Sequence, residues 1–141
     1  MNEDIRWLQR FQNFSQAMSL LRSAFSEDRE LNQLEQEGAI QRFEYTWELA
    51  WKTVKDFLEY NGVQIPPPIG ARNVIKEATT AFFEQSEIDG EIFMQMLISR
   101  NELSHTYSFA KFSQELGKIE QLYLPQLEKL HCFLLERSEH E

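Results

Sequence analysis

The segment from Arg100 to Tyr107 carries the densest set of side chains able to do chemistry in this sequence. It contains the guanidinium of Arg100, the amide of Asn101, the imidazole of His105 and the phenol of Tyr107. An imidazole can accept a proton from a ribose 2′-hydroxyl or give one to a leaving oxygen. A guanidinium can stabilise negative charge that develops on phosphorus through two parallel hydrogen bonds. Arg100 and His105 therefore provide the groups that metal-free cleavage of a phosphodiester needs.

The spacing of Arg100 and His105 sets a condition on this chemistry. Residues five apart on an α-helix differ by about 140° around the helix axis, so the two side chains do not share one face. Three arrangements would bring them together. The long Arg100 side chain can bridge part of the gap, the helix can unwind near His105, or two protomers can meet across a two-fold axis and form one composite cleft. A lone His with an Arg nearby is also common in structural helices, so the pair by itself does not establish an activity.

Other kinds of reactive or ligand-binding site find no support in the sequence. It contains no Gly-rich phosphate loop, no His-x-x-x-His pair and no carboxylate array suited to Mg²⁺ and a nucleoside triphosphate. Cys132 is the single cysteine, which excludes a disulfide framework and a Cys-based zinc site and favours a reducing compartment. Its apolar neighbours, Leu130, Phe133 and Leu134, predict that this thiol is an inert part of the core. We therefore expect neither a metal nor a cofactor.

The composition indicates one folded, acidic domain. The chain has 141 residues, of which 42% are hydrophobic, and its 11 Phe, 4 Tyr and 3 Trp exclude a disordered solvating chain. A single core typically holds roughly 100 to 200 residues, so we expect one domain over residues 1–141. The net charge of −9 argues against broad binding of nucleic acid. No apolar run approaches the ~18 residues of a membrane span, and residues 1–10 lack the apolar centre of a signal peptide, so we expect a cytoplasmic protein without membrane contact.

Apolar residues recur every three or four positions along most of the chain, a pattern typical of helices with one buried face. The predicted helices cover residues 3–25, 31–60, 71–85, 90–104 and 111–137. A bend is expected in the last helix at Pro125. Within the second helix, Phe43, Trp47 and Trp51 form an aromatic stripe that we expect to lie in the core. The sequence thus predicts an all-α, up-and-down bundle of about five helices with antiparallel neighbours.

The two ends of the second helix carry signals of different strength. A capping box beginning at Ser26 would need Glu or Gln three residues on, but that position is Arg29, so the start signal is weak. Asn61-Gly62 gives a clear end, because Gly readily adopts the left-handed conformation. The following prolines cannot continue a helix, so residues 62–70 form the one clear loop.

Two separate segments, taken in order, resemble one protein family. The first is Gly38–Lys52, GAIQRFEYTWELAWK, and the second is Arg100–Tyr107, RNELSHTY. Together they look like the nucleotidyltransferase substrate-binding proteins, the HepT-like branch of the HEPN superfamily. That branch carries the motif Arg-x4-His-x-Tyr, which Arg100, His105 and Tyr107 match residue by residue.

The resemblance implies a helical bundle that forms a homodimer, with the motifs of both protomers lining a shared cleft. Many HEPN proteins are metal-independent ribonucleases, and HepT-like members are typically encoded beside a minimal nucleotidyltransferase that acts as antitoxin. His105 would then be the general acid or base, Arg100 would stabilise the pentacoordinate phosphate, and Asn101 would orient the phosphate or His105. The partner would transfer AMP to Tyr107, and the added charge and bulk would block an RNA phosphate.

Two functions remain open at this point. The chain is either the ribonuclease toxin of a toxin-antitoxin pair, or a non-catalytic subunit that docks a nucleotidyltransferase or presents a substrate to it. The acidic surface favours the second. A dimer cleft would, however, bring two copies of Arg100 and His105 together, so the local potential could be positive on an acidic body.

Overall fold

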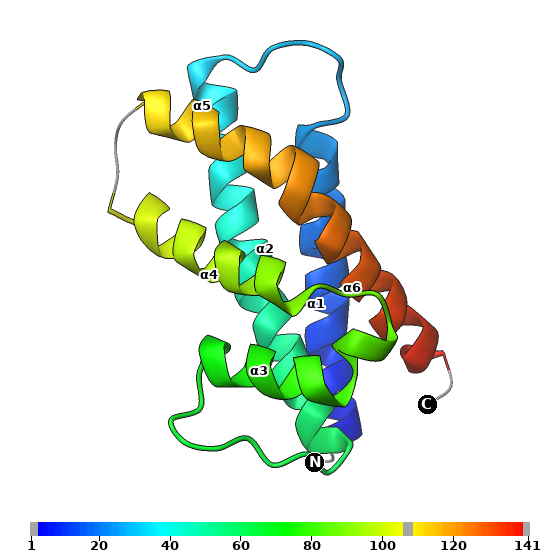
Figure 1. Cartoon of the computed structure of the whole chain (residues 1–141). Coiled ribbons are helices and arrows are strands. Elements are labelled where there is room, and N and C mark those ends of the chain that lie inside the picture. The colour runs from blue at the N-terminus through cyan, green and yellow to red at the C-terminus, as the bar shows by residue number, and fades with distance from the viewer. Residues whose placement is uncertain (1–2, 106–108, 140–141) are drawn as a thin grey trace.

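The computed structural model describes residues 3–105 and 109–139, and within these ranges it contains helices and no strand (Figure 1). The α-helices are α1 (Glu3–Ala24), α2 (Gln33–Tyr60), α3 (Ala71–Ala81), α4 (Gly90–Leu103), α5 (Phe109–Lys118) and α6 (Leu124–Ser138). A short 3₁₀ helix, η1 (Phe83–Gln85), follows α3, and a π-helical segment, η2 (Ile119–Tyr123), joins α5 to α6. Since α5, η2 and α6 form one continuous rod, the predicted all-α bundle of about five helices is confirmed.

The long helices α1 and α2 form an antiparallel pair at the centre of the bundle (Figure 1). The rod of α5 and α6 crosses this pair, with α5 against α2 and α6 against α1, while α3 and α4 cover another side of α2. Phe43 and Trp47 of the predicted aromatic stripe are fully buried between these layers, together with Trp7 and Phe14 of α1. Burying each such side chain contributes roughly 1.5 to 3 kcal/mol. No helix in the described ranges is both long enough and apolar enough to span a membrane.

Helix α2 begins at a cap that the sequence prediction missed. Asn32 is the N-cap, and its Oδ1 accepts a hydrogen bond from the Glu35 backbone N–H at 2.8 Å. The Glu35 carboxylate accepts the Asn32 backbone N–H at 2.9 Å, which completes a capping box. A hydrogen bond from Arg29, and then the one from Asn32, lowers the pKa of Glu35 to about 2. The box lies six residues after Ser26, whereas Gly62, with φ +79°, ends the helix as predicted.

The third and the last of the predicted helices needed correction at one end. The third helix stops at Ala81, because Phe82 adopts φ −137° and the chain continues as η1 instead of α-helix. The final rod begins at Phe109. A bend was predicted at Pro125, and the structure has the π-helical segment η2 just before that residue. There the Leu124 N–H donates to the carbonyl of Ile119, five residues back. Pro125 has no N–H to donate, so widening of the preceding turn lets the helix pass it.

Cys132 lies on the exposed face of α6, so the prediction of a core thiol was wrong. Leu130 and Leu134 are fully buried, and Cys132 is two residues from each. Residues two apart differ by about 200° around a helix, so the inward position of these leucines turns Cys132 outward.

His131 fastens α6 to α1. Its ring stacks on Phe11 at a centroid distance of 5.2 Å, meets the edge of Phe14 at 5.7 Å, and its Nε2 lies 2.9 Å from the Ser15 hydroxyl. Burial lowers the pKa of His131, and the nearby positive charge of Arg22 lowers it further. The neutral imidazole is therefore the form that fits this contact.

We expect His131 to make the fold less stable in mild acid. Its native pKa lies below its ordinary value of 6.5, so as the pH falls the unfolded chain binds the proton first and the free energy of unfolding decreases. Urea unfolding at pH 8 and pH 5 should therefore show a larger loss for the native chain than for His131→Gln. A Ser15→Ala variant keeps the burial and should retain the pH dependence. Equal losses for the native chain and His131→Gln would contradict this account.

Candidate functional site

The C-terminal end of α4 gathers three of the predicted site residues. Arg100 and Asn101 lie in the last turn of the helix, which ends at Leu103. His105 lies in the turn just beyond, where its backbone N–H donates to the Glu102 carbonyl at 3.1 Å. Of the three arrangements considered from sequence, the structure shows the helix ending before His105. The rotation of about 140° expected within a continuous helix therefore does not apply.

The three side chains differ in exposure. Asn101 and His105 are exposed, whereas the Arg100 side chain is one third exposed. Within the part of the chain that the structure describes, no hydrogen bond or ion pair joins Arg100, Asn101 and His105. Tyr107, the predicted AMP acceptor, lies outside the described residues. The protomer thus supplies an accessible imidazole and amide beside a partly covered guanidinium.

Glu48 of α2 is the counter-charge of Arg100. Its Oε1 lies 3.4 Å from Arg100 Nε, at ion-pair distance but without hydrogen-bond geometry. The same carboxylate accepts a hydrogen bond from Trp51 Nε1 at 3.2 Å and lies 3.7 Å from Lys52 Nζ. Trp51 was predicted to lie in the core, but it is only partly buried. Its indole N–H contacts Glu48 at the surface of the bundle. Both side chains are about one third exposed, and an ion pair of this exposure is worth about 1 kcal/mol or less.

A second contact between α2 and α4 lies one helical turn from the first. The Ser104 hydroxyl is 3.3 Å from Glu44 Oε2 and also contacts the carbonyl of Arg100 at 3.0 Å. Glu44 and Glu48 lie four residues apart on α2 and so share one face of the helix. Nothing in their spacing indicated α4 as the partner, because only the crossing of two helices brings these groups together.

Buried contacts fix α4 behind the site. Ser99 lies on the inner side of α4, and its hydroxyl is 2.6 Å from the Tyr123 hydroxyl of η2 in the core. Leu103 is also buried at the helix end. Arg100 and Asn101 are thus presented by a helix whose opposite face is held by packing and a buried hydrogen bond.

Helix α5 holds the other side of the site. Lys111 Nζ lies 3.3 Å from a carboxylate oxygen of Glu102 on α4 and 3.3 Å from one of Glu115 on α5. These two carboxylates, Glu102 first, raise the pKa of Lys111. Glu115 is completely buried and has Lys118 as a second cation at 3.4 Å. The helices on both sides of His105 are therefore tied to each other by charge.

The side chains at this site are of the types used in acid–base and phosphate-stabilising chemistry. His105 is a group able to transfer protons, and Arg100 and Asn101 are hydrogen-bond donors for an anion. The described residues contain no group of three His, Cys, Asp or Glu side chains placed to hold a metal ion.

Comparison with known proteins places this chain in a family. Residues 9–136 match the family described as nucleotidyltransferase substrate binding protein like. A crystal structure of a protein from Thermus thermophilus is similar, with a TM-score of 0.69 and 28% identity over 83% of this chain and 94% of that chain. No curated protein gives a match. Because the family match includes α2, the site and nearly all of the bundle, the chain belongs to the nucleotidyltransferase substrate-binding-like proteins, the HepT-like family of HEPN proteins.

Proposed function

We propose that this chain is the toxin of a toxin-antitoxin pair, a homodimeric, metal-independent endoribonuclease that is neutralised when a minimal nucleotidyltransferase transfers AMP to Tyr107. The observation that carries the proposal is the exposed end of α4, where Arg100, Asn101 and His105 lie together in a chain of this family. The other segment that resembles the family, GAIQRFEYTWELAWK, lies on α2, which contacts α4.

The proposed reaction needs only side chains and RNA. As general base, His105 takes the proton of a ribose 2′-hydroxyl, and the 2′-oxygen attacks phosphorus. Arg100 stabilises the charge on the pentacoordinate phosphate, and Asn101 orients a phosphate oxygen or the imidazole. The bond from phosphorus to the 5′-oxygen then breaks, that oxygen receives a proton from a protonated His105, and a 2′,3′-cyclic phosphate remains. Two copies of His105 in a dimer cleft provide both the base and the acid.

The outer surface of α4 supports a second copy as the missing half of the cleft. Ile98 is 53% exposed, and Asn101 lies one turn further along the same helix and is also exposed. A contact with a second copy across a two-fold axis would cover Ile98 and bring the polar site residues of both copies together. Two copies of Arg100 would then offset the acidic character of each chain at that place.

The direct test combines an RNA cleavage assay with intact-mass analysis. The chain purified without the transferase should cleave RNA in the presence of EDTA near neutral pH, and the product ends should be 2′,3′-cyclic phosphates. After co-expression with the transferase encoded beside it, the chain should gain the mass of one or more AMP groups at Tyr107 and lose cleavage. Intact RNA after incubation with the AMP-free chain would overturn the ribonuclease proposal.

The alternative is a non-catalytic subunit that docks a nucleotidyltransferase or presents a substrate to it. The pairing of Arg100 with Glu48 and the net charge of −9 favour it, because both reduce attraction for a polyanion. It predicts a stable complex with the transferase but no RNA cleavage by the chain alone.

Glu48→Gln is expected to tighten binding of a short RNA about two- to fivefold, since a pair exposed to this degree is worth up to about 1 kcal/mol. The amide keeps the shape of the side chain and removes the charge that competes with phosphate for Arg100. Fluorescence anisotropy in a His105→Ala background would measure binding without cleavage. Glu59→Gln is a matched control, because it removes one charge from the same helix about 16 Å away, beyond the screening length. Equal effects of both variants would show that Glu48 does not compete locally.

A further inference from the structure

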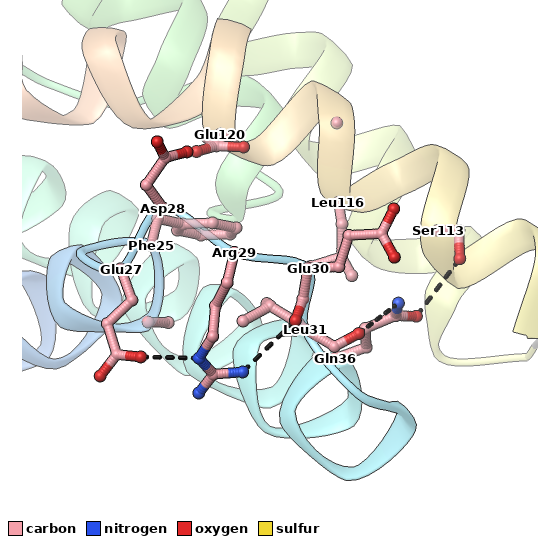
Figure 2. A pocket seen from close by; sticks show the side chains of 12 residues that line it. Phe25, Glu27, Asp28, Arg29, Glu30, Leu31, Gln36, Ser113, Leu116 and Glu120 are labelled. Atoms are coloured by element: carbon pink, nitrogen blue, oxygen red, sulfur yellow. Dashed lines mark hydrogen bonds and ion pairs between the residues drawn. The ribbon is translucent and has the colours of Figure 1, made fainter.

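A groove of about 770 Å³ lies apart from the candidate site, between the loop joining α1 to α2 and helix α5 (Figure 2). Its lining combines apolar side chains with carboxylates. The apolar residues include Phe25, Leu31 and Leu116, and the acidic residues are Glu27, Asp28, Glu30 and Glu120. Nothing in the proposed ribonuclease reaction uses these residues.

The loop that forms one wall is held in place by Arg29 (Figure 2). Its guanidinium donates to Glu27 at 2.7 Å, to the Glu30 carbonyl at 3.3 Å and to Glu35 at 2.9 Å. The positive charge of Arg29 is thus paired with the carboxylates of Glu27 and Glu35 through charge-assisted hydrogen bonds. The wall is therefore preformed, and Arg29 does not neutralise the remaining acidic residues.

The rim has unbalanced negative charge. Among the described residues, none forms an ion pair with Asp28, Glu30 or Glu120, and all three are exposed. Three carboxylates around an apolar floor fit Lys or Arg side chains that flank an apolar anchor. The same charges repel the phosphates of RNA, and a second copy of this chain, at −9, would bring more negative charge. A basic segment of a different protein is the occupant that complements this groove.

Gly117 of α5 lies in the wall of the groove and has open space beside it. A Cβ built at this position would meet no atom within 4 Å. Gly is unfavourable in a helix interior, so helix stability does not account for its presence. A side chain at Gly117 would point into space that the fold leaves empty.

We propose that this groove docks a basic segment of the nucleotidyltransferase partner. An apolar side chain of that segment packs on Phe25 and Leu116, and its Lys or Arg side chains pair with Asp28, Glu30 and Glu120. The inference rests on the proposed function for the identity of the partner.

Isothermal titration calorimetry of this chain with the transferase encoded beside it measures the binding affinity and tests the groove. Gly117→Trp fills it and is expected to weaken binding about tenfold or more, as blocking the centre of an interface does. Gly70→Trp is the matched control, because a Cβ there also meets no atom within 4 Å, its backbone is extended, and it lies at the start of α3 and does not line the groove. We expect it to bind like the native chain. The double variant Glu30→Lys, Glu120→Lys should weaken binding about as much as Gly117→Trp.

Circular dichroism and thermal unfolding would establish that all variants fold, and each should cleave RNA like the native chain. Native affinity for Gly117→Trp and for the charge reversal would overturn the docking site. A native chain that does not bind the transferase would overturn both the docking site and the partner half of the proposed function. If the binding pattern is as expected but the native chain leaves RNA intact, the docking site stands and the ribonuclease half fails.

Discussion

Replacing His105 by Ala is expected to slow RNA cleavage by about 10²- to 10⁴-fold, the usual contribution of a positioned acid or base. The alanine variant cannot accept the proton of the 2′-hydroxyl or return one to the leaving oxygen. Single-turnover cleavage of a short labelled RNA would measure the chemical step directly. RNA affinity should change little by comparison, because the imidazole contributes most in the transition state.

Two features make His105→Ala a sharp test. His105 is exposed in a turn, so its truncation should leave the free energy of unfolding nearly unchanged, and a loss of cleavage cannot be attributed to unfolding. Ser104→Ala is the neighbouring control, since it removes the contact with Glu44 but no group able to transfer protons near neutral pH. It should retain cleavage within a few fold. If His105→Ala cleaves like the native chain, the proposed mechanism is wrong.

Arg100→Ala is expected to reduce kcat by about 10²- to 10³-fold, as loss of a group that stabilises transition-state charge does. Arg100→Lys restores the charge but not the planar pair of donors, so it should recover only part of the rate. Initial rates at several RNA concentrations would separate kcat from KM for the three proteins. A larger loss in kcat than in binding would show that the guanidinium acts on the transition state.

Arg22→Ala is the matched control for Arg100→Ala. Arg22 of α1 also forms an exposed ion pair between two helices, with its Nε 2.6 Å from Glu128 of α6. Its loss removes the same charge from the chain and a stronger contact, two hydrogen bonds to Glu128, but away from the end of α4. Cleavage by Arg22→Ala should match that of the native chain. A drop as large as that of Arg100→Ala would mean that both variants act through stability or net charge.

The helices were predictable because each carries its own periodic pattern. Burial of Phe43 and Trp47 follows from apolar residues that must leave water wherever the helix packs. The end of α2 followed from Gly62, since glycine adopts the left-handed backbone conformation without strain.

Errors arose where a neighbouring element decides the outcome. Cys132 is exposed because α6 turns its leucines toward α1 and the core, a rotation that apolar neighbours in the sequence do not determine. Trp51 fits the apolar spacing of α2, yet it is partly exposed and donates a hydrogen bond to Glu48. The start of α2 is a different case, because its capping box is local to Asn32 and Glu35 and the sequence prediction considered Ser26 instead.

By itself, the sequence determined an all-α bundle and the group of reactive side chains at Arg100, Asn101 and His105, because helix periodicity and side-chain chemistry are properties of short segments. The tertiary structure decided what surrounds that group. It placed Glu48 against Arg100, ended α4 before His105, and set α5 beside the loop of Arg29 to leave a groove at Gly117. These features depend on how helices far apart in sequence cross, and packing of the whole core fixes those crossings.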